Sequence, residues 1–209
     1  KGCMLAAAPE TNYGAGVATA KALLQQGAIG KVLYADARFR WPGDENWHPN
    51  PAFLYQPGAG PLYDRGPYFL NAMVDLLGGV DQVSAMTAIG FPTRTVTSKL
   101  RYGEVFPVET PSHVQGMLRF SSGVLATLLL SFDMKCPYDS AIEIFGTEGS
   151  ILIKELVGFG GPVYLSKNTA SYEEVPLINN MTGNIRGYSV ADMAECIETG
   201  RTDFMAPGT

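Results

Sequence analysis

Two side chains that can exchange protons stand four residues apart where a loop meets a predicted helix. Asp64 carries a carboxyl group and Tyr68 a phenol, and a spacing of four places both on one face of a helix. Such a pair can act as an acid and a base in catalysis. The same pattern also fits a helix cap followed by an ordinary half-exposed face, and spacing alone leaves both interpretations open.

The residues around this pair predict the helix that must position it. Residues 58–63 form a loop rich in glycine and proline, and Asp64 is a good N-cap residue. Pro67 falls in the first turn, where its missing N–H is tolerated. We therefore expect a helix from Asp64 to Leu77, ended by Gly78.

A long loop without obvious secondary structure, residues 42–63, precedes this helix and contains Trp47 and His48. Loops of this length are more often functional than idle. For His48, a role in a site and a structural role stay equally open. The second histidine, His113, begins a predicted strand, which favours a structural role. Two distant histidines and no CxxC pair do not suggest a metal site.

The rest of the chain predicts one α/β unit followed mainly by strands. Residues 2–7 are an apolar run typical of a buried strand, residues 13–26 have helical spacing, and Glu10 is among the candidate caps. A last amphipathic helix is expected at 188–199. Alternating apolar and polar residues predict the strands. These are expected at 32–41, 82–89, 113–120, 124–132, 141–145, 150–154, 163–166 and 172–175.

These elements predict an α+β fold, in which an open, largely antiparallel sheet of six or more strands carries its helices on one face. The expected strand at 124–132 is apolar on both faces, because Leu128, Leu129 and Leu130 follow one another. An apolar sheet face that no helix covers is typical of a surface buried by another protein chain. We therefore expect a homo-oligomer, a dimer or tetramer, formed through the open sheet face.

Composition excludes several partners. The formal net charge is −5 and the sequence pI about 5.0, without a run of Lys and Arg, so nucleic acid is a poor partner. No apolar run approaches the roughly 20 residues of a membrane span. Cys3, Cys136 and Cys196 are odd in number and widely spaced, as is typical of free thiols in a reducing cytoplasm.

Four stretches resemble, in order, parts of the Gfo/Idh/MocA oxidoreductases. "GAGVATAKALLQQGAIGK" (14–31) resembles the last helix of that family's nucleotide-binding domain, and "GPLYDRGPYFLNAMVDLLG" (60–78) its Asp-x-Gly-x-His helix. "EIFGTEGSI" (143–151) resembles its Gly-Thr-x-Gly hairpin, and "ADMAECIETGR" (191–201) the helix before its C-terminal segment. The helix motif and the hairpin together are fairly specific.

The resemblance implies a two-domain enzyme that uses NAD or NADP to oxidise a sugar, cyclitol or other polyol by hydride transfer. Residues 1–30 would be a remnant of the dinucleotide-binding domain, and residues 31–209 the substrate-binding and oligomerisation domain. The glycine fingerprint and the family's Glu-Lys-Pro lysine would then precede residue 1. On this basis the cofactor is bound mainly there, and these 209 residues are not expected to bind it alone.

The resemblance also implies roles for residues. Asp64 matches the family's Asp, whereas Tyr68 stands where the family has His, and together they would be the catalytic pair. His48, Trp47 and Asn71 would bind the substrate. Tyrosine has a reference pKa of about 10, so it is a poor base at neutral pH unless a cation lowers that pKa. This departure leaves two alternatives, a non-catalytic sensor or regulator and a glycosidase that uses NAD.

Overall fold

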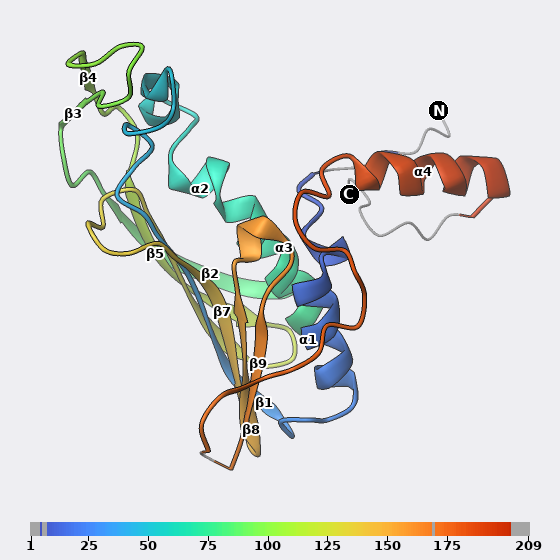
Figure 1. The fold of residues 1–209 in the computed structure, drawn as a ribbon. Coiled ribbons are helices and arrows are strands. Elements are labelled where there is room, and N and C mark those ends of the chain that lie inside the picture. The colour runs from blue at the N-terminus through green and yellow to red at the C-terminus, as the bar shows by residue number, and fades with distance from the viewer. Residues whose placement is uncertain (1–4, 6–7, 169, 202–209) are drawn as a thin grey trace.

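A computed structural model describes residue 5, residues 8–168 and residues 170–201, and most of these residues build one large sheet (Figure 1). Its strands are β1 (Val32–Arg40), β2 (Val80–Ala88), β5 (His113–Phe120), β6 (Leu125–Ser131), β7 (Asp139–Gly146), β8 (Gly149–Lys154), β9 (Val163–Lys167) and β10 (Glu173–Glu174). The eight strands lie in the order β10-β9-β8-β7-β1-β6-β5-β2. A separate two-stranded sheet pairs β3 (Thr93–Thr95) with β4 (Val105–Pro107).

The pairing of the strands confirms the predicted α+β class. β1 runs parallel to β6, and every other neighbouring pair of described strands is antiparallel. A parallel pair needs a long connection, and here that connection carries the helices next to the candidate site. The helices are α1 (Ala15–Gln25), α2 (Pro61–Asp64), α3 (Gly66–Leu77) and α4 (Tyr188–Thr199). The 3-10 helices are η1 (Thr11–Tyr13), η2 (Pro51–Tyr55) and η3 (Leu156–Gly158).

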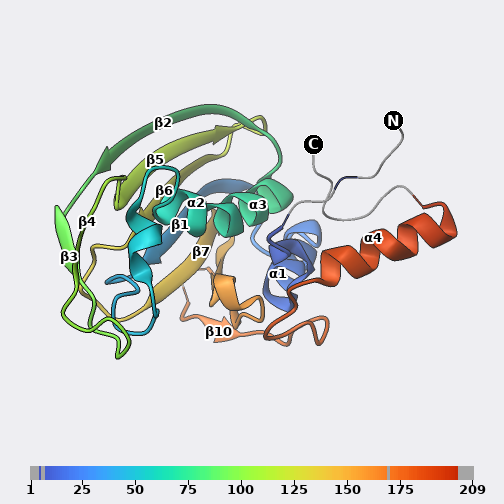
Figure 2. The ribbon, with the colours of Figure 1, turned by 90° about the horizontal axis from the view of Figure 1, so that it is seen from above.

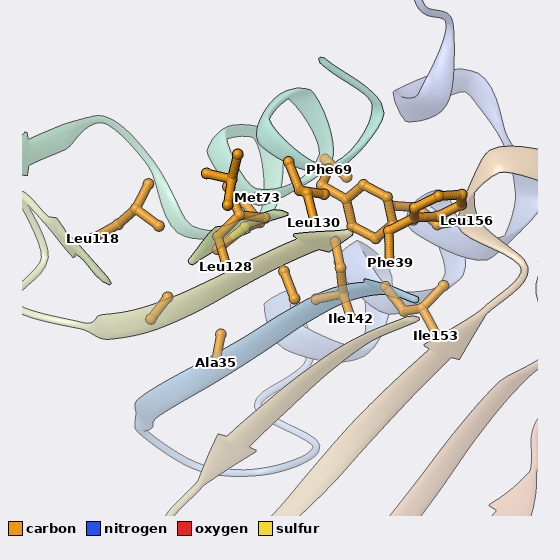
Figure 3. Close-up of a cluster of buried hydrophobic side chains, with 14 of the residues drawn as sticks. Ala35, Phe39, Phe69, Met73, Leu118, Leu128, Leu130, Ile142, Ile153 and Leu156 are labelled. Atoms are coloured by element: carbon orange, nitrogen blue, oxygen red, sulfur yellow. The ribbon is translucent and has the colours of Figure 1, made fainter. Parts of the chain in front are cut away.

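Helices cover one face of the curved sheet. Figure 2 shows α2 and α3 inside its concave side, α1 beside them, and α4 reaching away from the sheet. Phe39 on β1 meets Phe69 on α3 edge to face, with 6.1 Å between the ring centroids. Met73 and Leu130 extend this apolar layer, which Figure 3 shows between α3 and the strands. Burial of such side chains stabilises the fold by roughly 1.5–3 kcal/mol each.

The opposite face of the sheet is open. Val83, Met86, Met117 and Leu125 expose between 55% and 84% of their surface on β2, β5 and β6. A shallow apolar hollow of about 640 Å³ lies among these strands. None of the helices in the described part of the chain combines the length and the apolar character that a membrane span requires.

The helix predicted from Asp64 is interrupted, and this corrects the expected N-cap. A short turn, α2, ends at Asp64, and α3 begins at Gly66 after a residue that belongs to neither helix. Pro67 explains the break, because it has no N–H to donate to the carbonyl four residues earlier. Asp64 instead lies inside the helical turn, its N–H bonded to the Gly60 carbonyl at 3.0 Å. Gly60 has φ +88°, and a Cβ there would lie 2.7 Å from the Pro111 carbonyl oxygen.

Other differences lie at loops and ends. The loop at 42–63, expected without secondary structure, contains η2 and α2, and β3 and β4 were not expected. Gly14 is the N-cap of α1, so Glu10 does not cap that helix. The expected strand at 172–175 shortens to β10. Apart from Leu5, the strand expected at residues 2–7 lies outside the described residues. The hairpins at 121–123 and 146–149 are confirmed.

Candidate functional site

Asp64 and Tyr68 line the same pocket, as their spacing predicts. The pocket holds about 340 Å³ and opens beside the junction of α2 and α3. We call it the Asp64–Tyr68 pocket. Its lining residues come from the N-terminal segment, from the helix pair and from the chain before α4. They are Ala8, Pro9, Glu10, Tyr63, Asp64, Pro67, Tyr68 and Arg186.

The Asp64 carboxyl has a raised pKa. Burial is the main cause, because it removes water from the charged form, and the nearby Asp44 carboxylate acts in the same direction. Arg65 and His48 oppose the shift. The Arg65 Nε atom lies 2.9 Å from Asp64 Oδ2 as an ion pair, although neither atom has a hydrogen-bond partner among the described residues. The folded chain therefore binds the Asp64 proton more tightly than an exposed aspartate would.

Asp44 extends this charge cluster away from the pocket. Its side chain is 1% exposed, and its Oδ2 atom lies 3.6 Å from Arg65 Nη2. Its Oδ1 atom accepts hydrogen bonds from the indole N–H groups of Trp41 and Trp47, both at 2.8 Å. One buried carboxylate thus ties Trp41 and Trp47 to Arg65, the residue that follows Asp64.

A cation lies against the Tyr68 phenol. Arg186 donates from Nη2 to Tyr68 Oη at 3.3 Å. The guanidinium also lies over the Phe159 ring, 5.3 Å from its centroid, and Tyr68 packs on the same ring at 6.1 Å. The phenol of Tyr68 is thus held beside the pocket between this guanidinium and the Phe159 ring.

Glu10 holds the segment that carries Arg186. Its Oε1 atom accepts hydrogen bonds from the Gly187 N–H and the Ser189 hydroxyl, both at 2.9 Å. Burial alone would raise the pKa of Glu10, but these two bonds and the charge of Arg186 outweigh burial and lower it. Glu10 is 5% exposed and charged at neutral pH, so it anchors the start of α4 beside the pocket.

Arg94 fixes the loop that carries Asp44 and Trp47. It donates to the Pro42 carbonyl at 2.9 Å, to Glu45 Oε1 at 3.2 Å and to the Phe132 carbonyl at 2.8 Å, and it pairs with Asp133. The side chain is 9% exposed. A buried arginine with this many partners joins the loop rigidly to the end of β6.

The structure separates the residues predicted to bind substrate. Trp47 lies in a second pocket, which Arg65 also lines. His48 lies between the rings of Trp47 and Phe53, and its Nδ1 accepts the Asn50 N–H at 3.0 Å. It lines neither pocket.

Asn71 donates from Nδ2 to the Pro9 carbonyl at 2.8 Å. It lines neither pocket, and instead holds a residue that lines the Asp64–Tyr68 pocket. Asn71 therefore reaches the site through the backbone of Pro9.

Sequence reasoning missed Arg186, Glu10 and Arg65 as members of the site. Arg186 lies 118 positions from Tyr68 in a segment without periodicity, so no spacing rule connects the two. Glu10 was interpreted as a helix cap. Arg65 had a usable signal, because a charged residue directly after the candidate Asp, before Gly66 and Pro67, stands at the helix junction.

The site as a whole presents two carboxyl groups, two phenols and a guanidinium around a small cavity. This set can bind hydroxyl groups and move a proton between Tyr68 and a ligand oxygen. Among the residues that the structure describes, no three His, Cys, Asp or Glu side chains come together as a metal site would require.

Comparison with known proteins identifies the family. Residues 17–152 match the model of the GFO/IDH/MocA C-terminal domain. The chain belongs to this family. This confirms the resemblance that rested on the Asp64 helix and the hairpin at 143–151.

The individual GFO/IDH/MocA relatives have low sequence identity to this chain, between 19% and 28% for three of them. The chain is 28% identical over 153 residues to a levoglucosan dehydrogenase from Pseudarthrobacter phenanthrenivorans, a match that covers 65% of this chain and 38% of that protein. Aldose-aldose oxidoreductase from Caulobacter crescentus, solved with glycerol, has a TM-score of 0.72 at 24% identity, over 99% of this chain and 57% of its own.

Levoglucosan dehydrogenase solved with NADH and levoglucosan has a TM-score of 0.69 at 19% identity, over 94% of this chain and 58% of its own. At this identity the two solved structures establish the fold of this GFO/IDH/MocA chain and no more. The chain spans about two fifths of the first relative and under three fifths of these structures.

Proposed function

We propose that this chain forms the substrate-binding part of an NAD(P)-dependent oxidoreductase that acts on a sugar, cyclitol or other polyol by hydride transfer. Membership of the GFO/IDH/MocA family supports the reaction class. The relatives named as levoglucosan dehydrogenase and aldose-aldose oxidoreductase support a sugar-like substrate. The observation that carries the proposal is the shared pocket of Asp64 and Tyr68, with Arg186 on the phenol.

In this proposal Tyr68 moves the proton. The Tyr68 phenolate would accept the proton of the substrate hydroxyl and become a neutral phenol, while a bound nicotinamide would accept the hydride as the alcohol becomes a carbonyl. Arg186 stabilises the phenolate before that transfer. Asp64 accepts a hydrogen bond from a substrate hydroxyl and orients the reacting carbon. Trp47, His48 and Asn71 lie outside this pocket and support the substrate indirectly, Asn71 through the Pro9 backbone and His48 through its packing on Trp47.

The residues present fit the substrate end of such a site. Asp64 and Glu10 bring two carboxyl groups to a pocket of about 340 Å³, which suits hydroxyl groups and repels a diphosphate. NAD or NADP would therefore be held mainly by residues outside this chain, and it would supply the hydride acceptor. We accordingly assign residues 1–30 to the end of a dinucleotide-binding domain and residues 31–209 to the substrate-binding and oligomerisation domain.

The partners follow from the open face and the charge. Val83, Met86, Met117 and Leu125 leave an apolar surface that a second copy of this chain would cover, giving a homo-oligomer. The net charge of −5 disfavours nucleic acid and anionic membranes. The thiol of Cys136 is free and exposed, which agrees with a reducing compartment, and we propose a cytoplasmic location.

The test is NAD(P)H absorbance of the full-length protein with a panel of sugars, cyclitols and polyols. We expect reduction with at least one of them, and a Tyr68→Phe variant that loses roughly 100-fold or more in kcat. Tyr102→Phe is the matched control, because Tyr102 is 77% exposed outside the site. Cofactor binding without any reduction would favour a regulator, and release of an aglycone without net NADH would favour a glycosidase. Either result would overturn the proposal.

A further inference from the structure

A second pocket is lined by Arg65, the residue that follows Asp64 in the chain. It holds about 250 Å³, and four of its six lining side chains are aromatic. We call it the aromatic pocket. Its lining residues are Phe39, Trp41, Asp44, Trp47, Arg65 and Tyr138. The break between α2 and α3 sends two consecutive residues into different pockets, Asp64 into the first and Arg65 into the second.

The aromatic pocket is built around a buried carboxylate. Asp44 is 1% exposed, and its Oδ1 atom orders both indoles through their N–H groups. Its Oδ2 atom is buried and has no hydrogen-bond partner among the residues described. Tyr138 stands edge-on to Trp41, with 5.4 Å between ring centroids. The indole and phenol rings are therefore fixed in place, while Trp47 stays 57% exposed at the solvent side.

The charges of the aromatic pocket decide which ligand it can take. Arg65 lies between two carboxyl groups, Asp44 and Asp64, so an anion meets no excess of positive charge. The same guanidinium lies over the Phe39 ring, 5.4 Å from its centroid, and repels a second cation from that ring. These charges disfavour both anions and cations, so the aromatic pocket suits a neutral ligand. Ring faces pack on its C–H groups, and guanidinium N–H groups donate to its hydroxyls.

We propose that the aromatic pocket is a subsite for a neutral sugar ring, the second ring of a substrate whose reacting ring lies in the Asp64–Tyr68 pocket. This inference rests on the proposed function. A volume of about 250 Å³ is small for a whole ligand and suits one ring. Asp64 lines the first pocket, and Arg65, the next residue and its ion-pair partner, lines the second, so the two rings of a disaccharide or a glycoside would occupy neighbouring pockets.

The chain contains two tryptophans, and both line this pocket, so their fluorescence reports on its occupancy. The full-length protein is titrated with cellobiose, maltose and, as the one-ring probe, methyl glucoside. The signal of interest is the part of the emission change that a Trp41→Phe/Trp47→Phe double variant lacks. We expect a saturable change with a disaccharide, at an affinity roughly tenfold higher than that of methyl glucoside.

A Tyr138→Ala variant sharpens the test, with Tyr102→Ala as the exposed control. Tyr138→Ala should weaken disaccharide binding roughly tenfold more than it weakens methyl glucoside binding, and Tyr102→Ala should change neither. Equal affinities for one and two rings, or tighter binding of glucosamine or glucuronate than of the neutral sugars, would overturn the subsite.

The two proposals fail differently. A tryptophan signal specific to disaccharides without any NAD(P) reduction would contradict the proposed reaction and support the subsite. Oxidation of polyols with equal binding of one-ring and two-ring sugars would contradict the subsite and support the proposed reaction.

Discussion

The guanidinium of Arg186 reaches the phenol of Tyr68 across 118 positions of sequence, with 3.3 Å between Nη2 and Oη. The contact places a cation beside the residue that the proposed function makes the proton acceptor. It also places one group of the site on the segment before α4, far from the helix that carries Tyr68. The geometry of the pocket therefore depends on how that segment docks.

Arg186→Gln tests the contact. Removing the charge should lower kcat of the full-length enzyme roughly 10- to 100-fold and change KM little, because the guanidinium stabilises charge on the phenol during proton transfer. Arg186→Lys should recover part of the loss. Arg101→Gln is the control, since Arg101 is paired with Glu104 at the surface and lines neither pocket. A rise in KM with unchanged kcat would show that Arg186 binds substrate instead.

Glu10 should make the docking of this segment sensitive to acid. Folding lowers the pKa of Glu10, so its contribution to stability is complete above the ordinary glutamate pKa of about 4.3 and is lost as pH falls through the lower folded value. Glu10→Gln keeps an acceptor and loses the charge, which should cost about 1–2 kcal/mol at pH 7. Hydrogen exchange of the Gly187 amide, bonded to Glu10, measures it. Exchange that is equally slow in both proteins at pH 7 would contradict the anchor.

Local sequence patterns predicted much of the fold, and they predicted Asp64 and Tyr68 among the residues that line the pocket. The alternation over residues 32–41 predicted the strand β1, and the spacing of four placed Asp64 and Tyr68 in one pocket. Both depend on residues close in sequence, where the geometry of one strand or helix decides the outcome.

Long-range contacts escaped prediction for the same reason. The parallel pairing of β1 with β6 joins segments about ninety positions apart, and no local period encodes a partner strand. Only Pro67 could have predicted the helix break. It has no N–H, so the backbone carbonyl of Tyr63 lacks its helical donor.

Asp64 should oppose folding at neutral pH. Folding raises its pKa, so the folded chain holds this proton more tightly than the unfolded chain, and the free energy of unfolding falls as pH rises through the interval between the two values. Asp64→Asn removes the ionisable group and should be the more stable protein at pH 7. The difference should shrink to nothing below the ordinary aspartate pKa of about 3.9.

Denaturant unfolding at several pH values checks this, with Asp81→Asn as an exposed aspartate control on β2. Asp44, Arg65 and His48 face Asp64 and set the size of the effect, so the pH dependence must be compared with their charges intact. Wild type that is more stable than Asp64→Asn at pH 7 would show that the ion pair with Arg65 outweighs burial.

Arg94→Met should be the most damaging single substitution near the site. The variant leaves Glu45 and Asp133 without their buried cation and frees the Pro42 and Phe132 carbonyls, so we expect a loss of about 3–5 kcal/mol in the free energy of unfolding. Arg101→Met, which removes an exposed pair, should cost about 0.5 kcal/mol or less. Because Arg94 anchors the loop of Asp44 and Trp47, tryptophan emission of the folded variant should also shift toward that of exposed indole. Denaturant unfolding followed by that emission measures both effects, and a variant as stable as Arg101→Met would show that the loop is held by its other contacts.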